Sequence, residues 1–217
     1  MPVMNRIPMH WLIAVAWVLL CTACEGDHGT TVDAPQKSFY SLHDALIHRE
    51  DAEELRLHDG VGDSLSPAIG LLENLTFLGI YDADLQYLPD EIANLRIGFL
   101  WLPRCKFQHI PPQICRLNGL HHLILDGNAI ESIPEEFVQL KYMTGLYLIG
   151  NKLTEFPRTR FSGEYCMGLA LDSNRLTSFD FTRADLPNIN YLSLVGNPLP
   201  DSVKAKLKAE FGTKVKL

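Results

Sequence analysis

A pattern of apolar and polar positions recurs along the chain at a step of 23 residues. In the stretch 120–140, Leu120, Leu123 and Leu125 stand at positions 1, 4 and 6, and Asn128 stands at position 9. The same order returns from Met143 onward. Seven units begin in this way, at Ala52, Leu75, Ile97, Leu120, Met143, Cys166 and Ile189. Every step is 23 residues except the 22 between the second and third units.

Positions 4 and 6 are aliphatic in all seven units, and thirteen of these fourteen residues are Leu. Side chains two apart share one face of a strand, so the pattern predicts a short strand in each unit with one face in the core. Stacking of the units then predicts a parallel sheet, with positions 3, 5, 7 and 8 on its other face.

Position 9 is Asn in the last four units, at Asn128, Asn151, Asn174 and Asn197. A side-chain amide there can donate and accept hydrogen bonds with backbone groups that a tight bend leaves unpaired. We therefore expect a structural ladder of asparagines. Gly60, Ala83 and Cys105 occupy this position in the first three units, so the ladder should be weaker there.

Position 15 is Pro in four consecutive units, at Pro89, Pro111, Pro134 and Pro157. Proline fixes φ and removes a donor, so the arc opposite each strand should be extended or a short helical turn. The fifth unit departs from the pattern in 158–163, and Asp180 replaces Pro in the sixth, so the outer side should be irregular there.

Both ends of the array show helical patterns. Ser41 is a suitable N-cap for a short helix within 38–51, which we interpret as the N-terminal cap. Asp201 or Ser202 is expected to cap a last helix in 201–217, the C-terminal cap. Residues 213–217 can add one edge strand.

The spacing L-x-x-L-x-L-x-x-N-x-L resembles that of the leucine-rich repeat family, over residues 52–200. The chain is similar to a short bacterial leucine-rich repeat lipoprotein with 23-residue LP-type repeats. This resemblance implies an α/β solenoid with a parallel concave β-sheet, an irregular or short-helical convex side, and helical caps at both ends. It also implies binding of proteins or ligands through the inner sheet, without catalysis.

Residues 1–23 have the layout of a secretory signal peptide. Arg6 precedes an apolar run from Trp11 to Leu20, and small residues precede Cys24. The run is about half of the roughly 20 residues that a membrane-spanning helix needs. Residues 24–37 have the polar, Gly- and Pro-containing composition of a linker.

The end of this segment resembles a bacterial lipoprotein signal, which implies a lipid on Cys24. The protein would then cross the inner membrane and stay anchored to the cell envelope. Glu25 is not the Asp associated with inner-membrane retention, which favours the outer membrane. Cys21 stands where Leu is usual, so simple secretion and an uncleaved anchor remain alternatives.

Charge and cysteine content exclude several classes. The net charge of −7, with no run of Lys or Arg, argues against nucleic acid as a partner. Three of the five cysteines lie beyond the first 24 residues, and none forms a C-x-x-C pair, so neither a disulfide framework nor a zinc site is expected. Cys105 is interpreted as structural.

The strand positions that face away from the core carry a group of aromatic and charged side chains. Aromatic residues gathered at one place on a surface are typical of interface hot spots. The predicted partner-binding residues are Tyr81, Trp101, Arg104, His122, Ile124, Asp126, Tyr147 and Ile149. A protein is the expected partner, a glycan is a weaker alternative, and self-association of the same patch is left open.

No catalytic constellation is found. His122 and Asp126 are four residues apart, but no third metal ligand is expected near them. The chain has no G-x-S-x-G elbow, P-loop or G-x-G-x-x-G motif. No enzyme activity, cofactor or metal is therefore expected. The leading interpretation is a non-catalytic protein-binding module of the bacterial cell envelope. The alternative is a self-associating or structural surface lipoprotein.

Overall fold

The computed structural model describes residues 37–58, 60–161 and 163–217. The expected signal peptide, Cys24 and residues 24–36 of the expected linker lie outside the described residues. The repeats and both caps belong to one compact unit, Pro35–Leu217.

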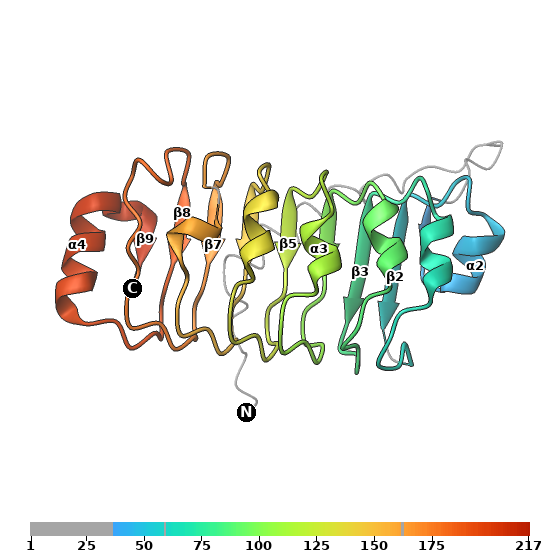
Figure 1. Ribbon diagram of the computed structural model, residues 1–217, viewed down its shortest axis with the longest axis horizontal. Coiled ribbons are helices and arrows are strands. Elements are labelled where there is room, and N and C mark those ends of the chain that lie inside the picture. Colours follow the sequence, from blue (N-terminus) through green and yellow to red (C-terminus); the bar gives the residue numbers. More distant parts are fainter. Residues whose placement is uncertain (1–36, 59, 162) are drawn as a thin grey trace, which may run out of the picture. The chain divides into compact units, whose positions relative to one another are not determined.

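One parallel sheet runs through this unit, and its nine strands follow each other in chain order (Figure 1). The strands are β1 (Ser38–Phe39), β2 (Glu54–His58), β3 (Phe77–Tyr81), β4 (Phe99–Trp101), β5 (His122–Ile124), β6 (Gly145–Tyr147), β7 (Gly168–Ala170), β8 (Tyr191–Ser193) and β9 (Val215–Lys216). Equivalent positions pair from strand to strand, as in Leu100 with Leu123 and Leu123 with Leu146. The predicted α/β solenoid with a parallel sheet is confirmed.

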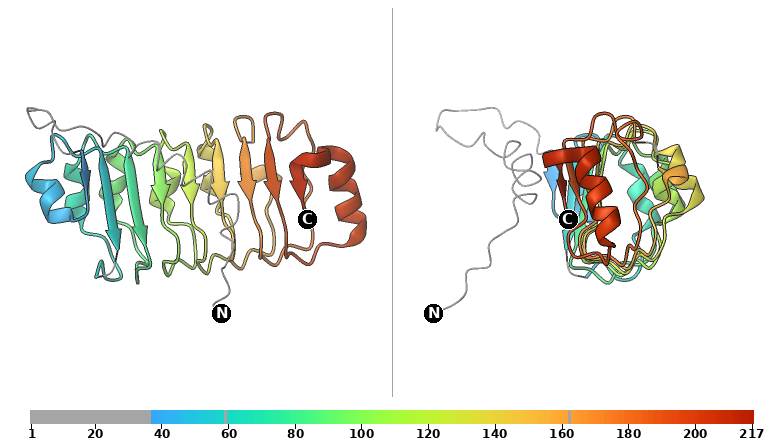
Figure 2. Two further views of the ribbon diagram at one scale, coloured as in Figure 1. Left: turned by 180° about the vertical axis from the view of Figure 1, so that it is seen from behind. Right: turned by 90° about the vertical axis from the view of Figure 1, so that its left-hand side faces the viewer.

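Short helices lie on the side of the unit opposite the sheet (Figure 2). The elements on that side are η1 (Pro67–Leu71), η2 (Asp90–Asn94), α3 (Pro112–Cys115), η3 (Glu135–Gln139) and η4 (Arg158–Arg160). Pro89, Pro134 and Pro157 each stand directly before one of these turns as its N-cap. The fixed φ of proline suits the start of a helical turn, which explains the short-helical outer side.

The core lies between the sheet and these turns. All fourteen aliphatic residues at positions 4 and 6 are buried, with at most 7% of their surface exposed. Burying a Leu side chain contributes about 1.5–3 kcal/mol relative to leaving it in water. No repeat can bury this row alone, so each repeat depends on its neighbours for stability.

The four asparagines at position 9 are buried, and in each of them Nδ2 donates to a carbonyl oxygen and Oδ1 accepts from an amide of the preceding repeat. In Asn174, Nδ2 donates to the carbonyl oxygens of Leu148 at 2.8 Å and Leu171 at 2.9 Å. Its Oδ1 accepts from the Leu153 amide at 3.0 Å. Each asparagine therefore links its own strand end to the preceding repeat. Cys105 supplies only a weak thiol donor, 3.5 Å from the Ile80 carbonyl oxygen.

Phenylalanines fill the interior where the proline pattern breaks. Phe156, Phe161, Phe179 and Phe181 are all buried, and the Phe179 and Phe181 ring centroids lie 4.6 Å apart. Phe156 joins this cluster at 5.7 Å from Phe181. The fifth repeat keeps its outer turn η4, whereas the described residues of the sixth repeat form no outer helix, and aromatic packing fills the interior there. The predicted irregular outer side is found in the sixth repeat but not in 158–160 of the fifth, and the sequence did not predict this cluster.

Helices close both ends of the array. The N-terminal helix α2 (Leu42–Ile47) has Ser41 as N-cap, and the Ser41 side chain accepts from the Asp44 amide at 3.4 Å. The C-terminal helix α4 (Asp201–Phe211) begins at Asp201 itself, with Pro200 as N-cap and no side-chain cap bond. The prediction that Asp201 or Ser202 caps this helix is therefore wrong. Proline holds the extended N-cap backbone, and Asp201 instead places its charge in the positive first turn. A short turn, η5 (Gly212–Lys214), then leads into β9.

Candidate functional site

The sheet has one face that is not covered by the short helices. We call the side chains at positions 3, 5 and 7 on this side the open face. Seven of the eight predicted partner-binding residues are at these positions, and Arg104 is at the following position 8. They belong to four neighbouring strands, β3 to β6, or to the residues directly after them. The parallel pairing therefore brings the predicted set into one region.

A first aromatic row crosses three strands. The His58 and Tyr81 ring centroids are 5.7 Å apart, and those of Tyr81 and Trp101 are 5.1 Å apart. Trp101 reaches toward β3 because Gly79 leaves room: a Cβ on Gly79 would lie 3.1 Å from Trp101 Cε3. The indole thus lies against the neighbouring strand and packs on the Tyr81 ring in a tilted arrangement, which holds both rings in place.

A second aromatic row runs beside the first at position 3. Phe77 and Phe99 stack with centroids 5.2 Å apart, and Phe99 stacks on His122 at the same distance. The Arg56 guanidinium lies 4.8 Å from the centre of the Phe77 ring, a cation–π contact. The predicted set included His122 but omitted the two phenylalanines. Both phenylalanines stand at position 3 of consecutive repeats, and this shared position could have been used to predict them from the sequence.

The open face continues over β5 and β6. Ile124 pairs in register with Trp101 on one side and Tyr147 on the other, and only 5% of its surface is exposed. It therefore supports the two aromatic residues rather than offering contact area of its own. Tyr147 is half-buried, and its hydroxyl oxygen would be 3.1 Å from a Cβ on Gly168. Burial raises the pKa of the Tyr147 phenol, so the hydroxyl remains a donor at neutral pH.

Asp126 is held at the end of this region. Its Oδ1 accepts a hydrogen bond from the Ile149 amide at 2.8 Å. Burial raises the pKa of Asp126 to about 7, and the Asp172 carboxylate acts in the same direction, whereas the Ile149 amide and Arg104 lower it. At neutral pH this carboxyl is therefore a mixture of neutral and charged forms.

Asp172 occupies the equivalent position two repeats later and was not in the predicted set. Its Oδ1 accepts from the Val195 amide at 2.8 Å and from the Ser193 hydroxyl. Its Oδ2 is buried and has no hydrogen-bond partner within the described part of the chain. Both carboxylates thus fasten one repeat to the next through the same backbone amide position.

Arg104 lies in the turn after β4 and pairs with Asp82 in the turn after β3. The distance from Arg104 Nη2 to Asp82 Oδ2 is 2.7 Å, and the hydrogen bonds from Arg104 lower the pKa of Asp82. Both residues have positive φ, 51° for Arg104 and 53° for Asp82. Gly127 takes the same position in the next repeat with φ 68°. The ion pair therefore sits on a left-handed turn that glycine adopts more readily.

The two adjacent histidines point to different partners. His121 is exposed, and its Nδ1 is 3.1 Å from the Tyr142 carbonyl oxygen. His122 stacks on Phe99, and its Nε2 is 3.2 Å from Thr144 Oγ1. Across residues 37–58, 60–161 and 163–217, no group of three or more His, Cys, Asp or Glu could hold a metal ion.

The three cysteines of the repeat unit are free and buried. Burial raises the pKa of the Cys105 and Cys115 thiols to about 11 and that of Cys166 to about 12. A protonated, buried thiol is a poor nucleophile. Within the described ranges no helix is long and apolar enough to cross a bilayer. The site as a whole offers contact area, stacked rings and hydrogen-bonding groups.

Comparisons with known proteins identify the architecture. Neither a protein-family model nor a curated protein matches the sequence. Among solved structures, an LRR protein from Leptospira interrogans matches with a TM-score of 0.59 and 24% identity, over 75% of this chain and 47% of that protein. At this identity the match shows the fold alone.

Two plant receptor structures also match. The peptide hormone receptor RGFR1, in complex with RGF2, has a TM-score of 0.52 and 28% identity over 69% of this chain and 24% of the receptor. The LRR ectodomain of GASSHO1/SCHENGEN3 from Arabidopsis thaliana, in complex with CASPARIAN STRIP INTEGRITY FACTOR 2, has a TM-score of 0.56 and 26% identity over 76% and 21%. The present chain thus spans less than half the length of each of these three proteins.

Proposed function

We propose, since this chain is a leucine-rich repeat protein, that its open face binds a protein partner and that the protein is not a catalyst. The observation that carries the proposal is the pair of aromatic rows on β2 to β5, where neighbouring ring centroids lie 5.1–5.7 Å apart. The two plant receptors named above were solved in complexes with RGF2 and CASPARIAN STRIP INTEGRITY FACTOR 2. Those complexes support repeat arrays of this kind as protein-binding modules.

The physical argument rests on preorganisation. Aromatic side chains contribute large contact areas, and rings already held by stacking lose little conformational freedom when a partner binds. Trp101 is fixed between Tyr81 and the space above Gly79, and Tyr147 lies against Gly168. We expect these two residues to be the hot spots of the interface, with Arg104 and Asp126 at its margin setting orientation.

The double substitution Trp101→Ala and Tyr147→Ala tests this proposal. Crosslinking on whole cells carrying the full chain would identify the partner, and purified proteins would give the affinity. Because two aromatic anchors are removed from the surface of a folded array, we expect affinity to fall at least about 30-fold. Tyr142→Ala, at an exposed tyrosine off the open face, is the matched control and should bind as the wild type does.

Unchanged capture of the same partner by a folded double variant would sink the open-face proposal. Sedimentation of wild type and double variant distinguishes the self-associating alternative. If the wild type forms dimers as its concentration rises and the double variant stays monomeric, the partner is a second copy of the chain.

We further propose that a lipid on Cys24 anchors the protein to the bacterial cell envelope. The support is the order of charged, apolar and small residues before this cysteine. Metabolic labelling with a palmitate analogue should label the wild type and leave Cys24→Ser unlabelled. The control is Cys21→Ser, which should still be labelled. Equal labelling of wild type and Cys24→Ser, or labelling of neither, would contradict the anchor.

A further inference from the structure

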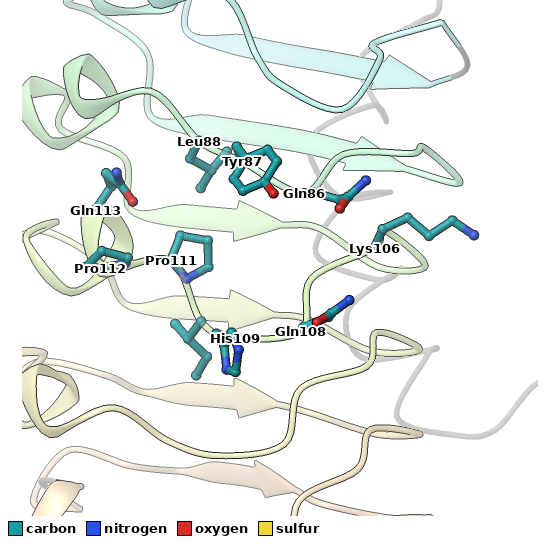
Figure 3. A pocket seen from close by; sticks show the side chains of 10 residues that line it. Gln86, Tyr87, Leu88, Lys106, Gln108, His109, Pro111, Pro112 and Gln113 are labelled. Carbon is teal, nitrogen blue, oxygen red and sulfur yellow. The ribbon is translucent and has the colours of Figure 1, made fainter.

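A groove of about 300 Å³ lies on the opposite side of the sheet from the open face, between the second and third repeats (Figure 3). One wall is the segment 86–88, which comes after strand β3, and the other is the segment 106–113, which comes after β4. None of the residues that line it belongs to the open face. Binding in this groove would be a property additional to the proposed function.

The backbone hydrogen bonds that join the second and third repeats end where the groove begins. Tyr87 is tied to the first repeat, since its amide donates to the Asp63 carbonyl oxygen at 3.0 Å. The Lys106 amide donates to the Leu85 carbonyl oxygen at 2.9 Å. Beyond that point, within the described residues, no backbone hydrogen bond joins 108–110 to 86–88. Pro111 and Pro112 have no amide hydrogen that could donate across the groove.

Both polar and apolar side chains line the groove. Figure 3 shows the side-chain amides of Gln86 and Gln108 at one end, together with the Tyr87 hydroxyl. Leu88, Pro111 and Pro112 lie toward the other end, where the Gln113 side chain also lies. The Gln113 amide donates to Asp90 Oδ1 at 3.1 Å. A glutamine amide can both donate and accept hydrogen bonds, and a tyrosine offers an apolar ring with a polar tip.

Lys106 is the one side chain of the types Lys, Arg, Asp or Glu among the described residues that line the groove. The ten lining residues include no carboxylate, and the ammonium group of Lys106 already has Asp84 Oδ1 at 4.0 Å. Tyr87 has 62% of its surface exposed, although its backbone is fixed to the first repeat. An exposed ring on a fixed backbone, next to two amides, suits a ligand with both an apolar face and several hydroxyl groups.

We infer that this groove binds a neutral carbohydrate. The Tyr87 ring packs against the apolar face of a sugar, and the amides of Gln86 and Gln108 bond to its hydroxyl groups. A volume of about 300 Å³ is at the lower end of the range for ligand pockets, which fits one or two sugar rings. Such a ligand differs in kind from the protein partner of the open face.

The test is a titration of the full chain with neutral sugars, followed by saturation-transfer NMR and calorimetry. The panel consists of glucose, galactose, mannose, N-acetylglucosamine, maltose, cellobiose and lactose. We expect at least one of them to bind. Tyr87→Ala should weaken that binding about tenfold, because the ring supplies most of the apolar contact. Gln108→Ala should weaken it as well, through loss of amide hydrogen bonds.

Tyr142→Ala is the matched control, since Tyr142 is 53% exposed and lies outside the groove. Its affinity for the sugar should equal that of the wild type. The inference is overturned if no sugar in the panel binds, if Tyr87→Ala binds as the wild type does, or if the groove takes a peptide instead. The Trp101 and Tyr147 double variant should keep sugar binding, so the two proposals fail or stand separately.

Discussion

Asn174→Ala is expected to lower the free energy of unfolding by about 3 kcal/mol. The substitution removes the acceptor of the Leu153 amide and the donor to the carbonyl oxygens of Leu148 and Leu171. These backbone groups lie in a buried bend, so water cannot replace the lost partner without opening the repeat. Urea denaturation of the full chain, monitored by circular dichroism, measures the change.

The exposed Asn190 serves as the control for this substitution. Asn190→Ala should alter the unfolding free energy by less than about 0.5 kcal/mol. Asn174 lies in the sixth of seven repeats, so its loss also weakens the contact between the fifth and sixth repeats. If Asn174→Ala proved as stable as Asn190→Ala, the role of the asparagine ladder in joining repeats would be wrong.

Phe181→Ala is expected to cost about 3–5 kcal/mol of stability. The Phe181 side chain is almost fully buried and contacts the rings of Phe156, Phe161 and Phe179. Truncation removes this area from the core and leaves a cavity, because the three remaining rings cannot all move in to fill it. The same urea denaturation measures the loss.

Two further substitutions separate cavity formation from other effects. Phe181→Leu keeps most of the volume and should cost much less than Phe181→Ala. Val138→Ala removes an exposed apolar side chain on the helical side and should cost little. Equal stability of Phe181→Ala and Val138→Ala would show that the phenylalanine cluster does not support the fifth and sixth repeats.

The periodic positions predicted the fold because burial leaves them little freedom. Leu123 and Leu125 must face the core together, and the same requirement holds for the matching residues in every repeat. Because the repeats have nearly constant length, their stacking places residues of the same repeat position side by side on neighbouring strands. The pairing of Leu123 with Leu146 shows this. The breakdown of the proline pattern also predicted an irregular outer side, but the pattern contains no information about which side chains fill it.

The open face could be predicted in part. Its location follows from the alternation of core-facing and outward-facing side chains along each strand. The parallel pairing then brings Trp101, Ile124 and Tyr147 side by side on adjacent strands. The direction in which each side chain leans cannot be derived in this way. Trp101 packs on the Tyr81 ring, two positions further along β3, because Gly79 leaves space beside it.

The sequence by itself determined the repeat, the sheet, the core and the face on which the aromatic residues lie. These features depend on spacing, because burial and stacking act on every repeat in the same way. Only the tertiary structure decided the stacking of Phe77, Phe99 and His122, the burial of Ile124, and the groove beside Tyr87. These features depend on side-chain rotamers and on where the backbone hydrogen bonds between the outer segments of two repeats end. Both are set by residues of neighbouring repeats.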